Sequence, residues 1–148
     1  MPESKFRKFI NLTGRDWCLL ISAGFWLVVF RLGLVLLPFQ FLRKSITWLV
    51  KPATQKEPDE ALTSRVIWAV MAVNRNVPVT GACLPRAMAA YVLLSRQEVP
   101  AELRIGVRRQ AGEFEAHAWV VSVDRVVIGN LDDLGSYSEL PITGVLEI

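Results

Sequence analysis

Hydrophobic positions are distributed unevenly along the chain, and their pattern separates an apolar first part from a mixed second part. Fourteen consecutive residues without a charge run from Trp17 to Phe30, and after Arg31 the apolar sequence continues to Leu42. A helix that is apolar on all sides must be buried in protein or in lipid. The pattern therefore predicts N-terminal hydrophobic helices that require a covering surface.

Two arrangements of this apolar stretch remain open. Residues 17–42 are long enough for a transmembrane helix, which needs about 20 apolar residues, but Arg31 near the middle would cost roughly 2.5 to 3.5 kcal/mol. We favour the alternative of two buried helices, or one long helix ending at Pro38, packed against protein or lying peripherally on a membrane. The candidate N-caps are Asn11, Thr13 and Asp16.

The second part begins after a segment of prolines and mixed charge, residues 51–59, which is typical of a linker. We therefore expect an N-terminal hydrophobic segment over residues 1–57 and a separate domain over 58–148. Apolar residues at helical spacing predict an amphipathic helix over 61–73. A second helix is expected within 80–97, where Pro85 belongs in the first turn and places Cys83 at or just before the N-terminus.

Alternating apolar and polar residues then predict three antiparallel strands, over 101–107, 114–123 and 125–130. Helices followed by such a meander indicate an α+β fold. If Asp124 and Arg125 form a two-residue turn, His117 lies directly across from Asp132, and Asn130 lies diagonally from it on the same face. A register shift of one residue would instead place His117 opposite Leu131.

The second part contains candidates for the three roles of a nucleophilic site, which are a nucleophile, a base and a group that orients the base. A helix N-terminus favours a thiolate over a thiol, and Arg86 adds a cation close to Cys83. His117 is a candidate base, and Asn130 or Asp132 could orient its ring. The alternative explanations are a small apolar cysteine that fills a gap, a half-buried histidine beside Trp119 and a solvated acidic turn.

Composition limits the other classes of function. The chain has 148 residues, which is an ordinary length for one domain. Hydrophobic residues make up 52% of it, and this fraction excludes a disordered tail. Residues 1–60 carry nine Lys or Arg and five Asp or Glu, whereas 61–148 carry eight and nine, so the net charge of +3 comes from the first part. Two cysteines and one histidine argue against a disulfide framework and a histidine metal cage. Neither a glycine-rich phosphate loop nor interleaved basic and aromatic residues are present, so we expect no cofactor, metal or nucleic acid.

Several motifs in order resemble a known family. These are CLPRA at the start of a helix, PAELRIGV, AHAW and VIGN, over roughly residues 60–141, preceded by an apolar segment containing LLPF. Together they are similar to the stand-alone leader peptidases of lasso-peptide biosynthesis, whose domain is transglutaminase-like or papain-like.

The resemblance implies a cysteine peptidase that removes the leader from a lasso-peptide precursor, with Cys83 as nucleophile and His117 as base. Relatives commonly have Asp where this chain has Asn130, so the third residue is either Asn130 or Asp132, and we lean to Asp132. The implied partners are the precursor, a separate leader-binding recognition element and an ATP-consuming macrolactam cyclase. The location does not come from the resemblance: the cysteine usage fits a reducing, cytoplasmic compartment, and the apolar stretch leaves a peripheral membrane contact open. The alternative functions are an acyltransferase and a membrane-associated scaffold with an inert cysteine.

Overall fold

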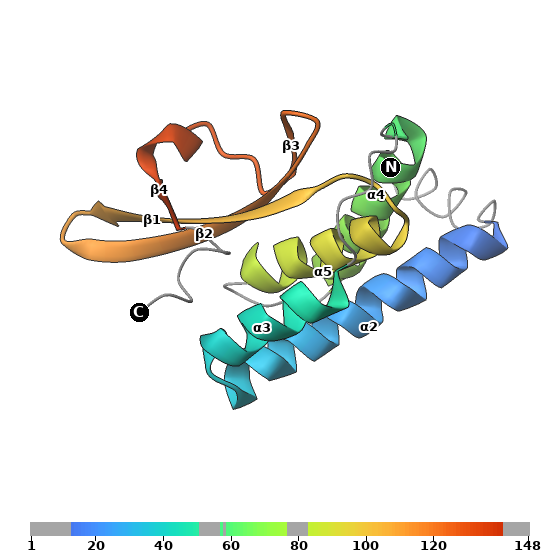
Figure 1. Cartoon of the computed structure of the whole chain (residues 1–148), viewed down its shortest axis with the longest axis horizontal. Coiled ribbons are helices and arrows are strands. Elements are labelled where there is room, and N and C mark those ends of the chain that lie inside the picture. Colours follow the sequence, from blue (N-terminus) through green and yellow to red (C-terminus); the bar gives the residue numbers. More distant parts are fainter. Residues whose placement is uncertain (1–12, 51–56, 58, 77–82, 141–148) are drawn as a thin grey trace.

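The computed structural model describes residues 13–50, 57, 59–76 and 83–140, and it places helices beneath a four-stranded antiparallel sheet (Figure 1). The expected linker at 51–59 lies almost entirely outside these residues. The helices are α2 (Gly14–Leu36), α3 (Phe39–Leu49), α4 (Glu60–Asn76) and α5 (Cys83–Arg96). They are followed by β1 (Glu102–Gln110), β2 (Glu113–Ser122), β3 (Arg125–Ile128), the short 3-10 helix η1 (Leu134–Ser136) and β4 (Ser138–Leu140).

The apolar segment forms a helical hairpin made of α2 and α3. Thr13 caps α2, and its backbone N–H donates to Oδ2 of Asp16 at 3.1 Å. Asp16 thereby satisfies an N–H group at the helix start that would otherwise lack a partner. Pro38 separates α2 from α3, as the sequence predicts, because a proline lacks the N–H that a continuing helix would need.

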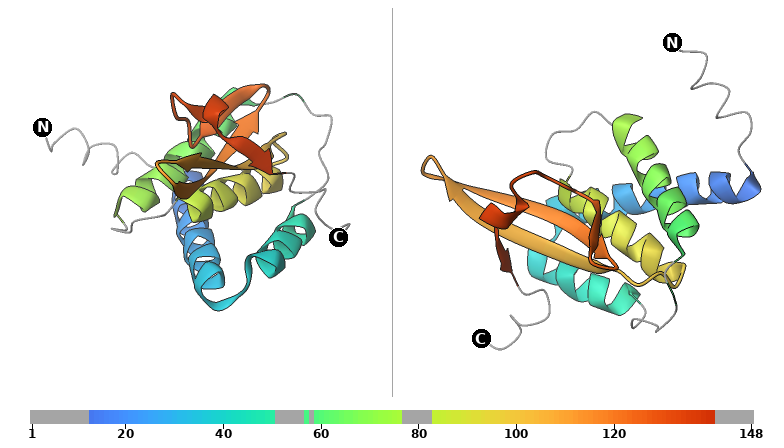
Figure 2. Two further views of the ribbon diagram at one scale, coloured as in Figure 1. Left: turned by 90° about the vertical axis from the view of Figure 1, so that its left-hand side faces the viewer. Right: turned by 90° about the horizontal axis from the view of Figure 1, so that it is seen from above.

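Helix α5 is the central element of the fold. Most of its side chains are buried, because the sheet covers it on one side and α2 and α4 pack against it on the other (Figure 2). One hydrophobic core runs from Leu19 of α2 through Met88 of α5 to Val120 of β2. The expected domain boundary at residue 57 stays a prediction. The hydrophobic core contains residues from both sides of this boundary.

The strand order is β3-β2-β1-β4. The β2–β3 hairpin differs from the expected one, because its turn residues are Val123 and Asp124 with φ of 51° and 57°. Two residues with positive φ are typical of a type I′ turn, whose twist matches that of the flanking strands. A register shift between Val120 and Val121 then moves the pairing by a further residue. The expected turn at Asp124 and Arg125 is therefore wrong.

Helix α2 is long and apolar enough to cross a membrane, and 28% of its most apolar 18-residue window is buried within the protein. Its length and composition fit a membrane anchor or a core helix. Its partial burial against α4 and α5 shows that at least one side of it belongs to the core.

Candidate active site

Cys83 is the first residue of α5, as the sequence predicts. Pro85 follows within the first turn and is buried, where its missing N–H costs no hydrogen bond. The thiol is half-buried, and the free N–H groups of a helix start favour negative charge beside it. Arg86 lies one turn further on, and its buried Nε has no hydrogen-bond partner among the described residues. Cys83 thus occupies a position suited to a nucleophilic thiolate.

His117 lies in the middle of β2 and is half-buried. Its Nε2 is 2.7 Å from the carbonyl oxygen of Gly129. Its ring stacks on Trp119, with ring centroids 6.0 Å apart, and lies 5.8 Å from the ring of Tyr137. A backbone carbonyl and two aromatic rings therefore fix the orientation of the imidazole.

Two glycines allow the chain to pack tightly around this histidine. Gly106 pairs with His117 across β1 and β2, and a Cβ there would lie 2.8 Å from both the Trp119 ring and the Cβ of Tyr137. Gly129 has a φ of +80°, and a Cβ there would lie 2.6 Å from the carbonyl oxygen of Ala118. Neither glycine was expected to be part of the site, although Gly106 lies in the PAELRIGV motif and Gly129 in the VIGN motif.

The structure does not bring His117 and Cys83 into contact. Successive side chains of a strand point to opposite faces, and Ala118 and Val120 of β2 belong to the core that contains α5. His117 and Trp119 point to the other face, which the segment from β3 to β4 covers (Figure 1). The ring of His117 thus lies on the side of β2 turned away from Cys83.

The expected third residue is not opposite His117 either. Pairing between β2 and β3 extends only from Ser122–Arg125 to Val120–Ile128, so no β3 residue lies across from His117. The direct pairing of His117 with Asp132 is therefore wrong, and the group that contacts the ring is the backbone of Gly129. Asn130 and Asp132 follow in the exposed turn after it.

A charged cluster borders the histidine on the same side of the sheet. Arg108 forms an ion pair with Asp133 and another with Glu115, whose Oε2 is 2.7 Å from its Nη2. Its guanidinium also lies 4.5 Å from the ring centroid of Tyr137. The hydrogen bond from Arg108 lowers the pKa of Asp133, and the charge of His117 contributes in the same direction.

Asp133 was expected only as part of the solvated acidic turn that also contains Asp132. One signal for the cluster was available, because Arg108 and Glu115 lie directly opposite each other in the β1–β2 hairpin. The contribution of Asp133 depends on the path of the turn after β3, which strand alternation does not determine.

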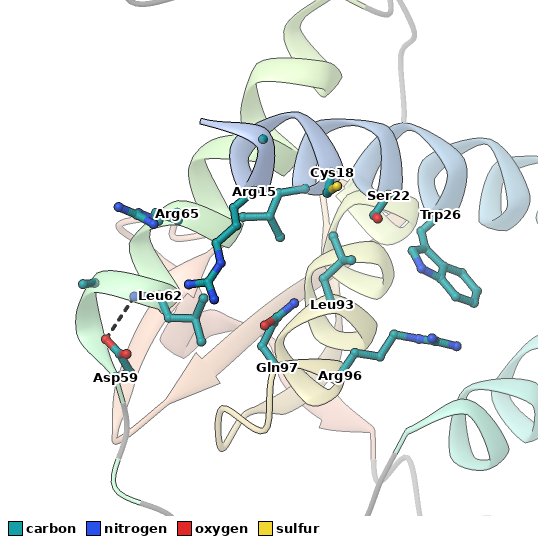
Figure 3. Close-up of a pocket in the computed structure, with 13 residues that line it drawn as sticks. Arg15, Cys18, Ser22, Trp26, Asp59, Leu62, Arg65, Leu93, Arg96 and Gln97 are labelled. Atoms are coloured by element: carbon teal, nitrogen blue, oxygen red, sulfur yellow. Dashed lines mark hydrogen bonds between the residues drawn. The ribbon is translucent and has the colours of Figure 1, made fainter. Parts of the chain in front are cut away.

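A large cavity lies away from both Cys83 and His117. It has a volume of about 830 Å³ and lies between α2, the start of α4 and the end of α5 (Figure 3). Arg15, Arg65 and Arg96 line it together with one carboxylate, Asp59. Asp59 already accepts a hydrogen bond from the N–H of Leu62. In the part of the chain that the structure describes, no group of three His, Cys, Asp or Glu residues could hold a metal ion.

Comparison with known proteins identifies the family. Neither the curated proteins nor the solved structures gave a significant match. The family model described as "Transglutaminase-like superfamily" matches residues 24–141, and this superfamily includes cysteine peptidases and acyltransferases. The match confirms the expected transglutaminase-like α+β fold. Because it runs from the middle of α2 to just beyond β4, over more than half of the sequence, the chain belongs to the transglutaminase-like superfamily.

Proposed function

We propose that this protein is a cysteine peptidase that removes the leader peptide from a lasso-peptide precursor. The observation that carries the proposal is the half-buried Cys83 at the start of the buried helix α5, in a chain of the transglutaminase-like superfamily. The ordered motifs around Cys83 and His117 support the choice of substrate. The enzymatic character of the superfamily supports a reactive cysteine rather than one that only fills space.

In this mechanism, Sγ of Cys83 attacks the carbonyl carbon of the last leader residue. Backbone N–H groups at the start of α5 stabilise the oxyanion that forms. The tetrahedral intermediate collapses, the C–N bond breaks, and protonated His117 gives its proton to the departing amine of the core peptide. Water then attacks the thioester and gives a proton to His117, and the leader carboxylate leaves as the thiolate of Cys83 is restored.

This mechanism requires the imidazole to approach the thiol. The pairing of β2 with β3 ends at Val120. Beside His117, β2 is therefore flanked by Gly129 and the turn after it, and not by a paired strand. Because the ring of His117 and the thiol of Cys83 lie on opposite sides of β2, we infer that β2 and this turn rearrange together when the substrate or a partner protein binds, so that the ring turns toward α5. In the structure, Nε2 donates to the carbonyl of Gly129 and Nδ1 holds the lone pair. Once the ring has left Gly129, the nitrogen that faces the thiol accepts its proton.

The proposed partners are a separate leader-binding recognition element and a macrolactam cyclase that closes the ring on the freed amine. The cyclase would consume ATP, whereas the cysteine chemistry of this chain needs no cofactor. We place the reaction in the cytoplasm, where free thiols persist and where the cysteine usage of the chain fits.

A reconstituted cleavage reaction with the precursor, recognition element and cyclase tests the proposal. Cys83→Ala should abolish release of the leader without changing the circular dichroism spectrum. Cys18→Ala is the matched control, because it removes the other thiol, an exposed one on α2, and should leave cleavage unchanged. Retained cleavage by Cys83→Ala would overturn the assignment of the nucleophile.

The mass of the products separates hydrolysis from transfer. Hydrolysis adds one water to the leader, whereas an acyltransferase would attach the leader to an added amine, and a dominant amine adduct would favour the second function. A third outcome is equally slow alkylation of Cys83 and Cys18 together with no cleavage. That result would favour a scaffold protein with an inert cysteine.

A further inference from the structure

Helix α2 has two apolar sides with different environments. Its inner side is buried against α4 and α5 and contains Leu19, Ala23, Trp26, Leu27 and Phe30. Its outer face, as we define it, is exposed and contains Trp17, Ile21, Phe25, Val28, Val29, Leu32, Val35 and Leu36. At about 100° per residue these sets lie on opposite sides of the helix. The outer face is thus a continuous apolar surface on a helix whose other side is in the core.

Helix α3 adds aromatic side chains to the same region. Phe41 is 58% exposed and Trp48 is 86% exposed, whereas Leu42 and Ile46 of the same helix are buried. Figure 2 shows α2 and α3 as the two arms of a hairpin on the side of the molecule away from the sheet. The exposed apolar surface therefore includes both helices. Surfaces of this kind mark sites of contact with protein or membrane.

The chemistry of the outer face fits lipid better than protein. Between Trp17 and Leu36, every exposed residue is apolar apart from Cys18. A protein interface forms about one hydrogen bond per 100 to 200 Å². Trp17 and the weakly polar thiol of Cys18 are the outer side chains here that could donate one. Acyl chains need no such bonds.

Basic residues flank the outer face on both sides. On the helical wheel Arg15 and Arg31 lie about 90° to 110° from its centre, one on each side, and Lys44 is exposed on α3. Arginine and lysine at such positions can extend to lipid headgroups while their stems cover apolar surface. The sequence before residue 61 carries nine basic and five acidic residues, so the charge complements an anionic membrane.

We propose that the outer face of α2, with Phe41 and Trp48 of α3, lies in the plane of an anionic membrane surface without crossing the bilayer. A crossing would withdraw Trp26 and Phe30 from the core that α2 shares with α4 and α5. Lying flat leaves this core intact and covers the exposed side. Helices with Trp, Phe and Leu on one side and basic residues at the flanks bind membranes in this way.

Flotation with lipid vesicles tests the proposal on the full chain. The native chain should float with phosphatidylcholine vesicles that contain one quarter phosphatidylglycerol, and more weakly with phosphatidylcholine alone or at high salt. The double variant F25S/L32S should bind at least about tenfold more weakly than the native chain, since it removes two apolar anchors. Phe114→Ser is the matched control, because Phe114 is 76% exposed on β2, on the sheet rather than on α2 or α3.

Fluorescence quenching gives a second measurement, in which the replaced side chains stay aromatic and apolar. Brominated lipids should quench Trp17 and Trp48, so the variant W17F/W48F should lose most of the quenching, whereas Trp119 is buried in the sheet. Charge reversal in R15E/R31E should weaken binding to anionic vesicles in particular. Both variants keep the apolar core of the chain.

Three results would overturn the inference. These are failure of the native chain to float with anionic vesicles, flotation unchanged in F25S/L32S, and a stable dimer that this variant dissociates. The last would assign the outer face to a second copy of the chain. Cys83→Ala should bind vesicles as the native chain does, so loss of cleavage and loss of membrane binding are separate results.

Discussion

Nε2 of His117 lies 2.7 Å from the carbonyl oxygen of Gly129. A carbonyl can only accept, so the imidazole nitrogen is the donor and carries the proton. The other nitrogen, Nδ1, then holds the lone pair in the neutral ring. A backbone group therefore sets the tautomer of His117, a role that the sequence had assigned to the side chain of Asn130 or Asp132.

Gly129→Ala should destabilise the protein more than Gly112→Ala. Both glycines have a positive φ, and an alanine in that region costs about 1 to 2 kcal/mol. At Gly112 nothing lies within 4 Å of the added methyl, whereas at Gly129 it would meet the Ala118 carbonyl at 2.6 Å. Urea unfolding of the two variants measures the difference, and equal losses would contradict the close approach of the chain to β2.

Alanine substitutions can identify the residue that supports His117 during cleavage. We expect Asp132→Ala or Asn130→Ala to reduce kcat, with Asp132 the one we favour. A third variant, Asp133→Ala, tests the carboxylate whose pKa responds to the charge of His117. If all three variants cleave at the native rate, none of these three side chains is needed to orient the ring.

Loss of His117 should slow alkylation of Cys83 and leave Cys18 unaffected. A base contributes about a hundredfold or more to such chemistry when it takes the thiol proton. Iodoacetamide labelling followed by mass spectrometry of the two cysteine peptides measures both rates in one sample, with Cys18 as internal reference. An unchanged rate at Cys83 in His117→Ala, with and without substrate, would show that the two side chains do not act together.

The ion pair between Arg108 and Asp133 should make stability depend on pH in the acid range. The pKa of Asp133 in the folded protein is lowered from its ordinary 3.8, chiefly by the hydrogen bond from Arg108. The stabilisation is therefore complete above this value and is lost as the pH falls through the lower folded pKa.

Urea midpoints measured from pH 6 downwards should show the effect as a shallower acid slope in Asp133→Asn. The change should be small, because the side chain of Asp133 is half exposed. Asp132→Asn is the control, since Asp132 takes part in none of the ion pairs found among the described residues. A native slope in Asp133→Asn would contradict the pairing.

Local sequence patterns predicted the helices and strands well. The caps and breaks at Thr13, Pro38 and Pro85 determine where helices begin and end, and alternation in β2 correctly placed His117 beside Trp119. The hairpin after β2 was not predictable in this way. Val123 at a φ of 51° is unusual for a β-branched residue, so nothing in its type signals a type I′ turn there.

The site was predictable in its parts and not in its assembly. Cys83 was placed correctly because a proline in a first turn fixes the register of the helix. The contacts of His117 depend on Gly129 and Tyr137, and on a short strand, β4, that pairs with β1. Such contacts join residues that are distant in sequence, and local periodicity contains no information about them.

The two sides of α2 also decide how the protein can be made more soluble. Deleting the hydrophobic N-terminal segment would remove Leu19 and Phe30 from the core and expose α5 to solvent. Replacing Val28 and Leu32 with glutamate or lysine would change the exposed side alone. Surface redesign of α2, rather than truncation, is therefore the route to a soluble form that keeps Cys83 in place.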